Sequence, residues 1–290
     1  MTPPLTRHDL GRQGFGTMRL REEASADPDR DPVAVVHAAL DAGLALVDTA
    51  DAYQNEGLVG RAIRGRRDEV LLATKFGLVW REDVAGDFDV RADPAYVRTA
   101  CEASLRRLGV DVIDLFYLHH RSQDVPVEDT AGAVGDLVTE GKVRAFGLSN
   151  VTADDLRRAH TVHRVTALQE QWSVTERGIE ESLLPAAAEL GTVVVAHSPT
   201  GHGLLHGEDA PSDLRTALAQ IGRDHDATAG QVALAWVHHQ QSQHGVPVVP
   251  LPGTTRVSHL RTNIAAADLE LSTDQLHRLD EVGSSGDPAG

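Results

Sequence analysis

Val112-Ile113-Asp114-Leu115-Phe116-Tyr117-Leu118 is a short, mostly apolar run rich in β-branched and aromatic residues, which is typical of a strand buried on both faces of a sheet. A helical pattern over about 127–140 follows it, and then a second apolar run, Val143–Leu148. Two such runs joined by a helix form a βαβ unit with parallel strands. The middle of the chain therefore predicts an α/β fold.

The same alternation extends in both directions along the chain. The other strand-like runs are Gly14–Met18, Leu44–Thr49, Val70–Lys75, Thr166–Gln171, Thr192–His197 and Val246–Leu251. The other helical patterns cover about 32–43, 56–66, 94–108, 152–160, 179–190, 228–241, 256–266 and 273–282. Eight strands joined mostly by helices predict a single-domain (β/α)8 TIM barrel over residues 1–290, with a frayed tail at 283–290.

An open, doubly wound parallel sheet is the structural alternative. Such a sheet binds a dinucleotide through a Gly-x-Gly-x-x-Gly turn between its first strand and helix. The stretch Gly11–Gly16 has its glycines at other spacings and leads into another strand-like run. The sequence therefore favours the closed barrel.

Composition narrows the class of protein. The chain has 290 residues, 41% of them hydrophobic and 24% charged, which is the balance of a globular protein. Its formal net charge of −16 repels polyanions, and only 4% of its residues are aromatic, so nucleic acid is not expected as a partner.

Cys101 is the single cysteine and cannot form an internal disulfide. The first residues, Met1–Asp9, contain no apolar segment of signal-peptide length, and no run approaches the length of a membrane span. We expect a cytoplasmic protein without a membrane partner. The sequence does not predict the oligomeric state.

Polar side chains follow three of the predicted strands. Asp48 ends the second run, Lys75 ends the third, and His119 follows Leu118, while Tyr53 lies in the loop after Asp48. The carboxyl ends of barrel strands meet at one mouth, where active sites form.

These four side chains form a chemical unit if they meet. An ammonium beside a phenol stabilises the phenolate, so we expect Lys75 to lower the pKa of Tyr53. Asp48 would keep Lys75 charged, and His119 would orient a substrate oxygen toward the phenol. Such a group protonates a carbonyl oxygen while hydride is delivered from elsewhere.

Several motifs in this order resemble the aldo-keto reductase superfamily. They are Asp48-Thr49-Ala50-Asp51-Ala52-Tyr53, Asn55-Glu56, Thr74-Lys75, Asp114–His119, Gly141–Asn150 and Leu251-Pro252-Gly253-Thr254-Thr255-Arg256. The resemblance runs from Gly14 to about Leu279. It implies a (β/α)8 barrel that binds NADPH without a Rossmann turn and reduces an aldehyde or ketone, with Tyr53 as the general acid.

The resemblance also assigns cofactor residues. Ser149, Asn150 and Gln169 match the partners of the nicotinamide carboxamide, and Thr17 and Met18 the turn beside its ribose. The remaining matches, to the pyrophosphate loop, the 2′-phosphate site and the adenine contact, are Ser198, Pro199, Gly201, Gly203, Gly253, Thr254, Arg256 and Asn263. His197 stands where many relatives have a stacking aromatic residue, and its charge depends on pH.

His119 and His120 are adjacent, and only one can take the catalytic place. Counting back from Val125-Pro126 places His119 there and leaves His120 as a pocket-wall candidate. Trp80 and Trp172 are the other candidate walls of the substrate pocket. We expect the substrate to be a small-molecule carbonyl or alcohol.

Three alternatives stay open. The barrel could act as a cofactor-sensing regulatory subunit with little turnover, or as an alcohol dehydrogenase. It could also be a metal-assisted hydrolase, because the chain has 15 histidines. His202 and His206 have the spacing of helical ligands, but Gly203 lies between them and no acidic third ligand follows, so no metal site is expected.

Overall fold

The computed structural model describes residues 5–22, 27–81, 87–206 and 211–284. Its main sheet has eight strands, which neighbour one another in the order β1 (Phe15–Gly16), β2 (Leu46–Asp48), β3 (Leu71–Phe76), β6 (Ile113–Leu118), β7 (Val143–Ser149), β8 (Val165–Gln171), β9 (Val193–His197) and β10 (Val248–Leu251). All neighbouring strands are parallel. The N–H groups of Gly14 and Gly16 donate to the carbonyls of Pro250 and Pro252, at 2.9 and 3.1 Å, and join β1 to β10. The predicted (β/α)8 barrel is confirmed.

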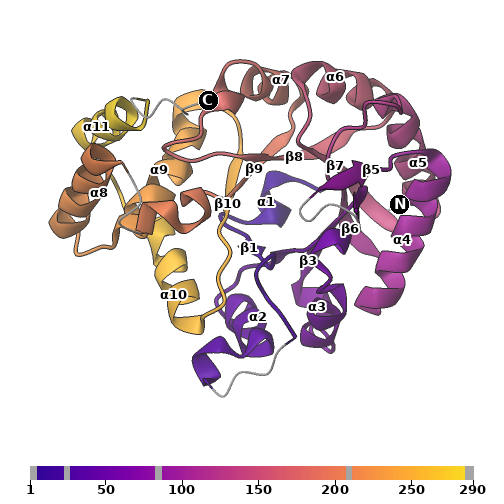
Figure 1. Ribbon diagram of the computed structural model, residues 1–290, viewed down its shortest axis with the longest axis horizontal. Coiled ribbons are helices and arrows are strands. Elements are labelled where there is room, and N and C mark those ends of the chain that lie inside the picture. The colour runs from indigo at the N-terminus through magenta and orange to yellow at the C-terminus, as the bar shows by residue number, and fades with distance from the viewer. Residues whose placement is uncertain (1–4, 23–26, 82–86, 207–210, 285–290) are drawn as a thin grey trace.

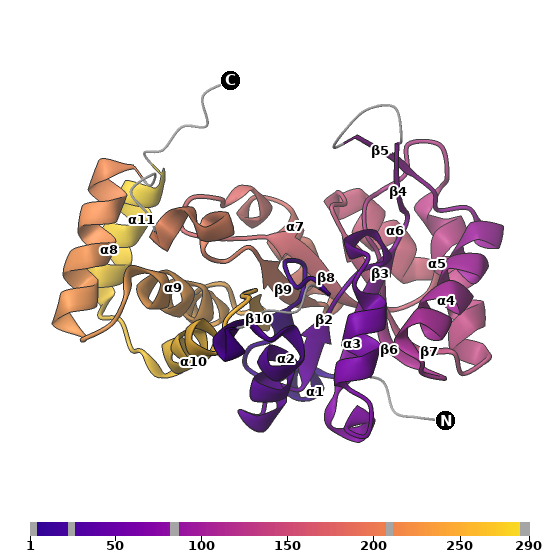
Figure 2. The same ribbon diagram turned by 60° about the horizontal axis from the view of Figure 1, so that its bottom comes forward.

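Helices surround the sheet (Figures 1 and 2). They are α2 (Pro32–Asp41), α3 (Glu56–Ala62), α4 (Pro94–Leu108), α5 (Val127–Thr139), α6 (Ala153–Val162), α7 (Leu183–Leu190), α9 (Ala229–His244) and α10 (Val257–Ala265). The Asp31 carboxylate accepts from the N–H groups of Val33 and Ala34, and Asp93 accepts from that of Tyr96. Both aspartates cap helices that begin with proline.

Three regions differ from the sequence prediction. Helix α8 (Ser212–Asp224) was not anticipated, although Leu214, Leu218 and Ile221 recur at helical spacing and are buried; it packs against α9 and α11 (Thr273–Ser284). Strands β4 (Leu78–Trp80) and β5 (Phe88–Val90) form an antiparallel hairpin. The pattern at 179–190 divides into a 3₁₀ turn, Gly178–Glu180, and α7.

The sequence predicts a frayed tail at 283–290, but its first two residues are helical. Residues 283 and 284 belong to α11, and a Cβ on Gly283 would lie 2.3 Å from the Val174 carbonyl oxygen, so the helix packs closely there. Residues 285–290 lie outside the described part of the chain. No helix in the described ranges combines the length and apolar composition needed to cross a membrane.

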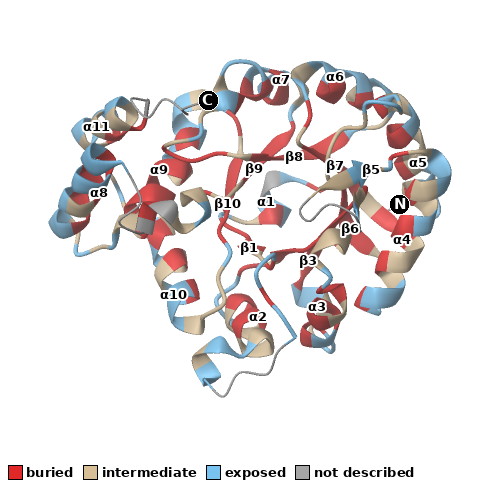
Figure 3. Cartoon of the chain, in the orientation of Figure 1, coloured by how far each residue is buried: buried red, intermediate tan, exposed pale blue. Residues whose placement is uncertain are grey.

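Buried apolar residues form two clusters, an outer layer between sheet and helices and an inner layer inside the barrel. Figure 3 shows that buried residues are concentrated along the strands of the barrel. The inner layer includes Leu71, Leu115 and Tyr117, and Leu10 of the short helix α1 (Arg7–Leu10) joins it. A Cβ on Gly147 would lie 2.3 Å from the Tyr117 ring, so glycine makes room for this ring in the interior. The barrel is therefore a packed support for the groups at its carboxyl end.

Candidate active site

Strand alternation gathers polar side chains at the carboxyl end of the barrel. Along β3, Leu71 and Ala73 belong to the inner apolar layer, and two residues further the inward position is Lys75. The same period of two places a polar residue at the end of four other inward rows. These residues are Asp48 on β2, Ser149 on β7, Gln169 on β8 and His197 on β9. A polar layer thus lies directly on the apolar interior.

Lys75 is the centre of this layer and is almost fully buried, with 1% exposure. Its ammonium donates to the Asp48 carboxylate, to the Thr49 carbonyl at 3.0 Å and to the Tyr53 hydroxyl at 3.3 Å. The other Asp48 oxygen accepts from Gln169 Nε2 at 2.9 Å. The buried ammonium is therefore paired with a carboxylate and further hydrogen-bonded, which a buried charge requires.

The pKa shifts follow from burial and from this pairing. Burial opposes the charge of Lys75, but the Asp48 carboxylate and the Tyr53 hydroxyl outweigh it, so the pKa of Lys75 is raised. Burial also raises the pKa of Asp48 against the opposing effects of Lys75 and Gln169. We take Lys75 to be charged at neutral pH.

Tyr53 differs from the sequence expectation. The charge of Lys75 does act to lower its pKa, but burial has the larger effect, and the pKa of Tyr53 is raised above its usual value of 10.0. In the protein without bound ligands the hydroxyl thus keeps its proton at neutral pH. The Tyr53 ring also lies against Lys75, whose Nζ is 4.9 Å from the ring centroid.

His119 lies beside Tyr53, whereas His120 does not. The His119 ring meets the Tyr53 ring edge-on with centroids 5.7 Å apart. Burial, with the charge of Lys75, lowers the pKa of His119 to about 2, so its imidazole is neutral. The His120 ring packs against Phe88 at 5.8 Å, and its Nδ1 pairs with the Arg121 carbonyl.

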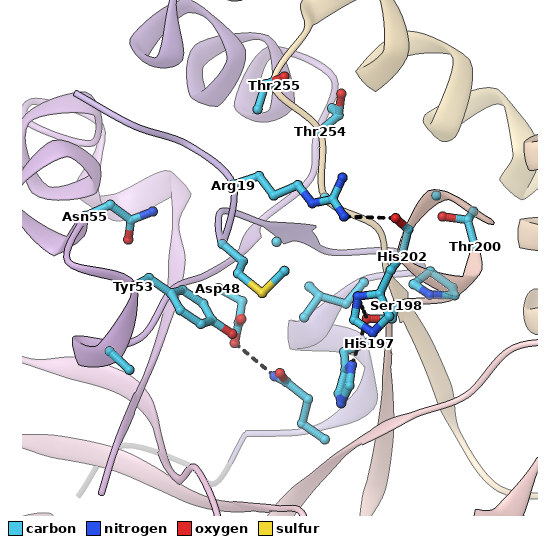
Figure 4. A pocket seen from close by; sticks show the side chains of 18 of the residues that line it. Arg19, Asp48, Tyr53, Asn55, His197, Ser198, Thr200, His202, Thr254 and Thr255 are labelled. Carbon is cyan, nitrogen blue, oxygen red and sulfur yellow. Dashed lines mark hydrogen bonds between the residues drawn. The ribbon is translucent and has the colours of Figure 1, made fainter. Parts of the chain in front are cut away.

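A cleft of about 1200 Å³ opens above these groups (Figure 4). The expected site residues that line it are Met18, Asp48, Tyr53, Trp80, His119, Ser149, Asn150, Gln169, His197, Ser198, Pro199, Gly203, Gly253, Thr254 and Asn263. They come from both halves of the chain, and those farthest from Tyr53 in sequence belong to α10 and the loop before it.

The amide side chains at the cleft floor are held by neighbours. Asn150 Nδ2 donates to the His119 carbonyl at 2.8 Å and to Ser149 Oγ at 3.0 Å. Asn150 has a positive φ of 52°, which asparagine tolerates better than most residues. Glu170 accepts from the Val151 N–H at 3.1 Å and supports this turn from below.

His197 begins a short polar chain along the cleft wall. Its Nδ1 pairs with Ser198 Oγ at 3.1 Å, and the same hydroxyl pairs with His202 Nδ1 at 3.2 Å (Figure 4). Burial lowers the pKa of His197 to about 3. The pH-dependent charge expected for His197 is therefore absent near neutral pH, and its neutral ring presents a flat face.

Besides Lys75, five expected site residues do not line the cleft. Trp172 is the clearest correction: it is fully buried, donates to Glu180 and packs edge-on against Trp236, because its position in the chain turns it into the layer between sheet and helices. His120 faces Phe88 instead. The others are Thr17, Gly201 and Arg256.

Thr17 and Arg256 have definite partners behind the cleft. The Thr17 hydroxyl donates to the Asp48 carbonyl at 2.9 Å and so ties the end of β1 to β2. The Arg256 guanidinium pairs with Asp29 at 3.1 Å and Asp27 at 3.4 Å. Lys75 also lies beneath the lining, under Tyr53.

Trp80 stands at the mouth of the cleft on the β4–β5 hairpin. Its indole N–H donates to the Ala52 carbonyl at 3.0 Å, next to Tyr53, while 45% of the residue remains exposed. Phe88 meets its ring edge-on with centroids 6.0 Å apart. The hairpin thus holds a fixed aromatic surface at the end of the cleft where Tyr53 lies.

Arg19, Asn55 and His202 also line the cleft but were not among the expected site residues. Arg19 donates to the His202 carbonyl at 2.9 Å, which links the loop after β1 to the loop after β9 (Figure 4). Asn55 is buried, donates to the Thr17 carbonyl and accepts from the Thr49 hydroxyl. The Asn55-Glu56 motif was the sequence signal that could have identified Asn55 as a site residue. The spacing of His202 and His206 indicated only a metal ligand, and Arg19 had no signal of either kind.

The described residues contain no group of three or more histidine, cysteine, aspartate or glutamate side chains arranged to hold a metal ion.

Gly253 shows how closely the chain approaches itself at the other end of the cleft. A Cβ at this position would lie 2.9 Å from the Gly16 carbonyl oxygen, so only glycine fits without a shift.

Known proteins resemble this chain over most of its length. The profile described as the aldo/keto reductase family matches residues 13–284. A probable aldo-keto reductase 1 of Glycine max is 37% identical over 311 aligned positions, which cover 97% of this chain and 88% of that protein.

Solved structures agree with this match. An aldo-keto reductase from Klebsiella pneumoniae in complex with NADPH has a TM-score of 0.81 and 31% identity, covering 97% of this chain and 95% of its own. The glycerol dehydrogenase of Gluconobacter oxydans has a TM-score of 0.84 and 26% identity, with the same coverage. Because the family profile extends from the first strand of the barrel to its last helix, this chain belongs to the aldo/keto reductase family.

Proposed function

We propose that the protein is an NADPH-dependent oxidoreductase that reduces an aldehyde or ketone to the alcohol, with Tyr53 as the general acid. One observation carries this proposal. The Lys75 ammonium donates to the Tyr53 hydroxyl oxygen, which leaves the hydroxyl proton free to be donated into the cleft that Tyr53 lines. A phenol held in this way is a proton donor for a carbonyl oxygen.

The cleft fits a nicotinamide dinucleotide in size and lining. Gln169 uses its N–H group on Asp48, so its oxygen remains to accept from a carboxamide, and Ser149 and Asn150 lie next to it. We assign the neutral His197 ring to stacking, and Ser198, Gly203, Gly253 and Thr254 to the phosphate and ribose groups. The NADPH-bound Klebsiella pneumoniae relative supports this choice of cofactor. The reduced nicotinamide supplies the hydride when it is bound.

The protein's own groups then divide the remaining work. Tyr53 gives its proton to the substrate oxygen, and the Lys75 ammonium stabilises the phenolate that remains. Asp48 and the Thr49 carbonyl fix the ammonium, so it cannot turn away. The neutral imidazole of His119 has one ring N–H, which donates a hydrogen bond to the same substrate oxygen and so positions the carbonyl for Tyr53.

The raised pKa of Tyr53 also gives the two directions different pH dependences. Reduction needs the protonated phenol, which is the form present at neutral pH. Oxidation of an alcohol needs the phenolate as base, so we expect oxidation to speed up as pH rises toward the pKa of Tyr53.

The test is a panel of aldehydes, ketones and alcohols, assayed by cofactor absorbance with NADPH, NADH and their oxidised forms. For a reduced substrate, Tyr53→Phe should lower kcat by about 10²–10⁴-fold, which is the usual contribution of a positioned acid. A variant that keeps the wild-type rate would refute the role of Tyr53.

Tyr96→Phe is the matched control. Tyr96 lies on α4 and its ring packs on Arg91, with the guanidinium carbon 4.4 Å from the ring centroid, so it loses the same hydroxyl outside the cleft. Its activity should match that of the wild type. If no carbonyl compound or alcohol in the panel is turned over with either cofactor, the proposal of an enzyme gives way to that of a cofactor-sensing subunit.

A further inference from the structure

Asp29 makes three contacts with the start of α10, which lies 229 residues further along the chain. One of its carboxylate oxygens accepts from the Ser258 N–H at 2.7 Å. The other accepts from the Ser258 hydroxyl at 2.8 Å and from the Arg256 guanidinium at 3.1 Å. Asp29 belongs to the 3₁₀ turn Pro28–Arg30, which packs against both α2 and α10.

These three donors are the kinds of group that bind a phosphate. A backbone N–H in the first turn of a helix, a hydroxyl and a guanidinium all stabilise an anion, and the helix dipole adds to their effect. Arg256 is the N-cap residue of α10, and its side chain makes no capping hydrogen bond. A remote carboxylate therefore takes the capping position.

The same segment forms one end of the cleft. Thr254 and Thr255, which precede Arg256, line it, and so do His259 and Asn263 on α10 itself. We place the adenosine part of the proposed NADPH at this end, where Asn263, which the sequence resemblance matches to the adenine contact, lines the cleft. The present inference rests on that assignment, because an adenosine here brings its 2′-phosphate toward the donors that Asp29 uses.

Charge repulsion prevents the Asp29 carboxylate and a 2′-phosphate from occupying the start of α10 together. Asp27 also faces Arg256, at 3.4 Å, so two carboxylates already surround this guanidinium. The hydrogen bonds from Ser258, and the charge of Arg256, lower the pKa of Asp29, which keeps it ionised at neutral pH. A phosphate dianion beside two carboxylates would be repelled by both.

We propose that Asp29 determines cofactor selectivity in this protein: its carboxylate occupies the anion position at the start of α10 and must leave before a 2′-phosphate can bind there. It therefore weakens the binding of NADPH relative to NADH, which has no phosphate at this position. The turn at Pro28–Arg30 has to separate from α10 when NADPH binds, and it can stay in place when NADH binds.

Asp29→Asn tests this in the full chain, because asparagine keeps the shape and an oxygen acceptor for Ser258 but removes the charge. Dissociation constants for NADPH and NADH are measured by titration calorimetry at fixed ionic strength, together with those for 2′,5′-ADP and 5′-ADP as fragments. We expect the variant to bind NADPH and 2′,5′-ADP about threefold to tenfold more tightly, with NADH and 5′-ADP changed less than about twofold.

Asp111→Asn is the matched control. It removes the same charge at an exposed residue just before β6, at the opposite end of the barrel, and should leave the ratio of the NADPH and NADH constants unchanged. Asp29→Ser is a second variant for the case in which asparagine disturbs the turn, and it should show the same preference for NADPH. Circular dichroism checks that each variant is folded.

Two results would overturn the inference. If both Asp29 variants bind NADPH as weakly as the wild type or more weakly, Asp29 only orders Arg256 and α10. If neither the wild type nor any variant binds NADPH, NADH or the fragments, then the proposed function fails first and the selectivity role fails with it. A selective gain for the 2′-phosphorylated ligands alone supports the proposal.

Discussion

Two charged regions of this barrel use the same chemistry in different surroundings. The buried centre, which consists of Asp48, Tyr53, Lys75 and His119, holds its ion pair inside the carboxyl end of the barrel, with 1% and 3% side-chain exposure for Lys75 and Asp48. The α10 rim, formed by Asp27, Asp29, Arg256 and Ser258, holds its ion pairs near the surface, where the Arg256 and Asp29 side chains are each 29% exposed.

The difference lies in what each pair can do. In the centre, the ion pair is shielded from water by its burial, so the ammonium acts strongly on the hydroxyl beside it, but breaking the pair leaves an isolated buried charge. At the rim, water and salt screen the charges, so one anion can replace another at little cost to the fold. The centre is suited to fixed chemistry, and the rim to exchange of a ligand.

The variant with the largest expected effect tests the buried centre. Lys75→Met removes the cation but keeps the apolar stem, which leaves Asp48 buried beside Gln169 alone. We expect the free energy of unfolding to fall by about 3–5 kcal/mol, and reduction to slow by about 10²-fold or more because the phenolate loses its stabilising charge. Urea denaturation and steady-state rates measure the two effects.

A double variant separates stability from catalysis. In Asp48→Asn with Lys75→Met neither partner is charged, so most of the lost stability should return while the rate stays low. If Lys75→Met alone is as stable as the wild type, the buried ion pair does not contribute to the stability of the fold. Recovery of the rate in the double variant would contradict the role of Lys75 in catalysis.

Glu170 shows what a buried carboxylate does without a cation. It accepts from the Val151 N–H, and the described residues supply no ion pair for it; burial raises its pKa from 4.5 to about 7. Since the folded protein then keeps a proton that the unfolded chain releases, the stabilising effect of this group is lost as pH rises from about 4.5 to about 7. Asp51, whose pKa burial also raises to about 7, acts in the same direction.

Glu170→Gln should therefore make the protein more stable at pH 8, by up to about 3 kcal/mol, and leave its stability at pH 4 unchanged. Urea titrations at the two pH values measure this difference. Glu181→Gln, at an exposed position, is the control and should follow the wild type at both. A Glu170→Gln protein with the wild-type pH dependence would show that Glu170 is not a buried proton carrier.

The centre was predictable from the sequence because burial leaves a strong signal there. A charged residue at the end of an apolar run, as with Asp48 and Lys75, is costly unless it is paired, and strand ends of a barrel meet at one mouth. The motifs around Tyr53 and His119 predicted the other two residues of the buried centre. The pKa of Tyr53 was beyond sequence reasoning, because it depends on how much protein surrounds the phenol in three dimensions.

The rim and the mouth were predicted less well, for physical reasons. The contact between Asp29 and Ser258 joins polar residues with no periodic pattern, so nothing local marks either of them. The β4–β5 hairpin had too short an apolar pattern to be distinguished from a loop. Trp172 was misplaced because a large aromatic residue after a strand suits a pocket wall and a packed layer equally well.

The variant with the smallest expected effect removes a cation from the α10 rim, as Lys75→Met removes one from the buried centre. Arg256→Ala also removes a cation that faces carboxylates, but these are partly solvated. Its midpoint of urea unfolding should shift by less than about a third of the shift caused by Lys75→Met, since exposed ion pairs contribute little to stability. Repeating both titrations in about 0.5 M NaCl sharpens the comparison: salt should reduce the Arg256→Ala shift further and leave the Lys75→Met shift nearly unchanged, because only the rim is reached by counterions. Equal shifts for the two variants, or equal sensitivity to salt, would mean that burial does not separate the two regions.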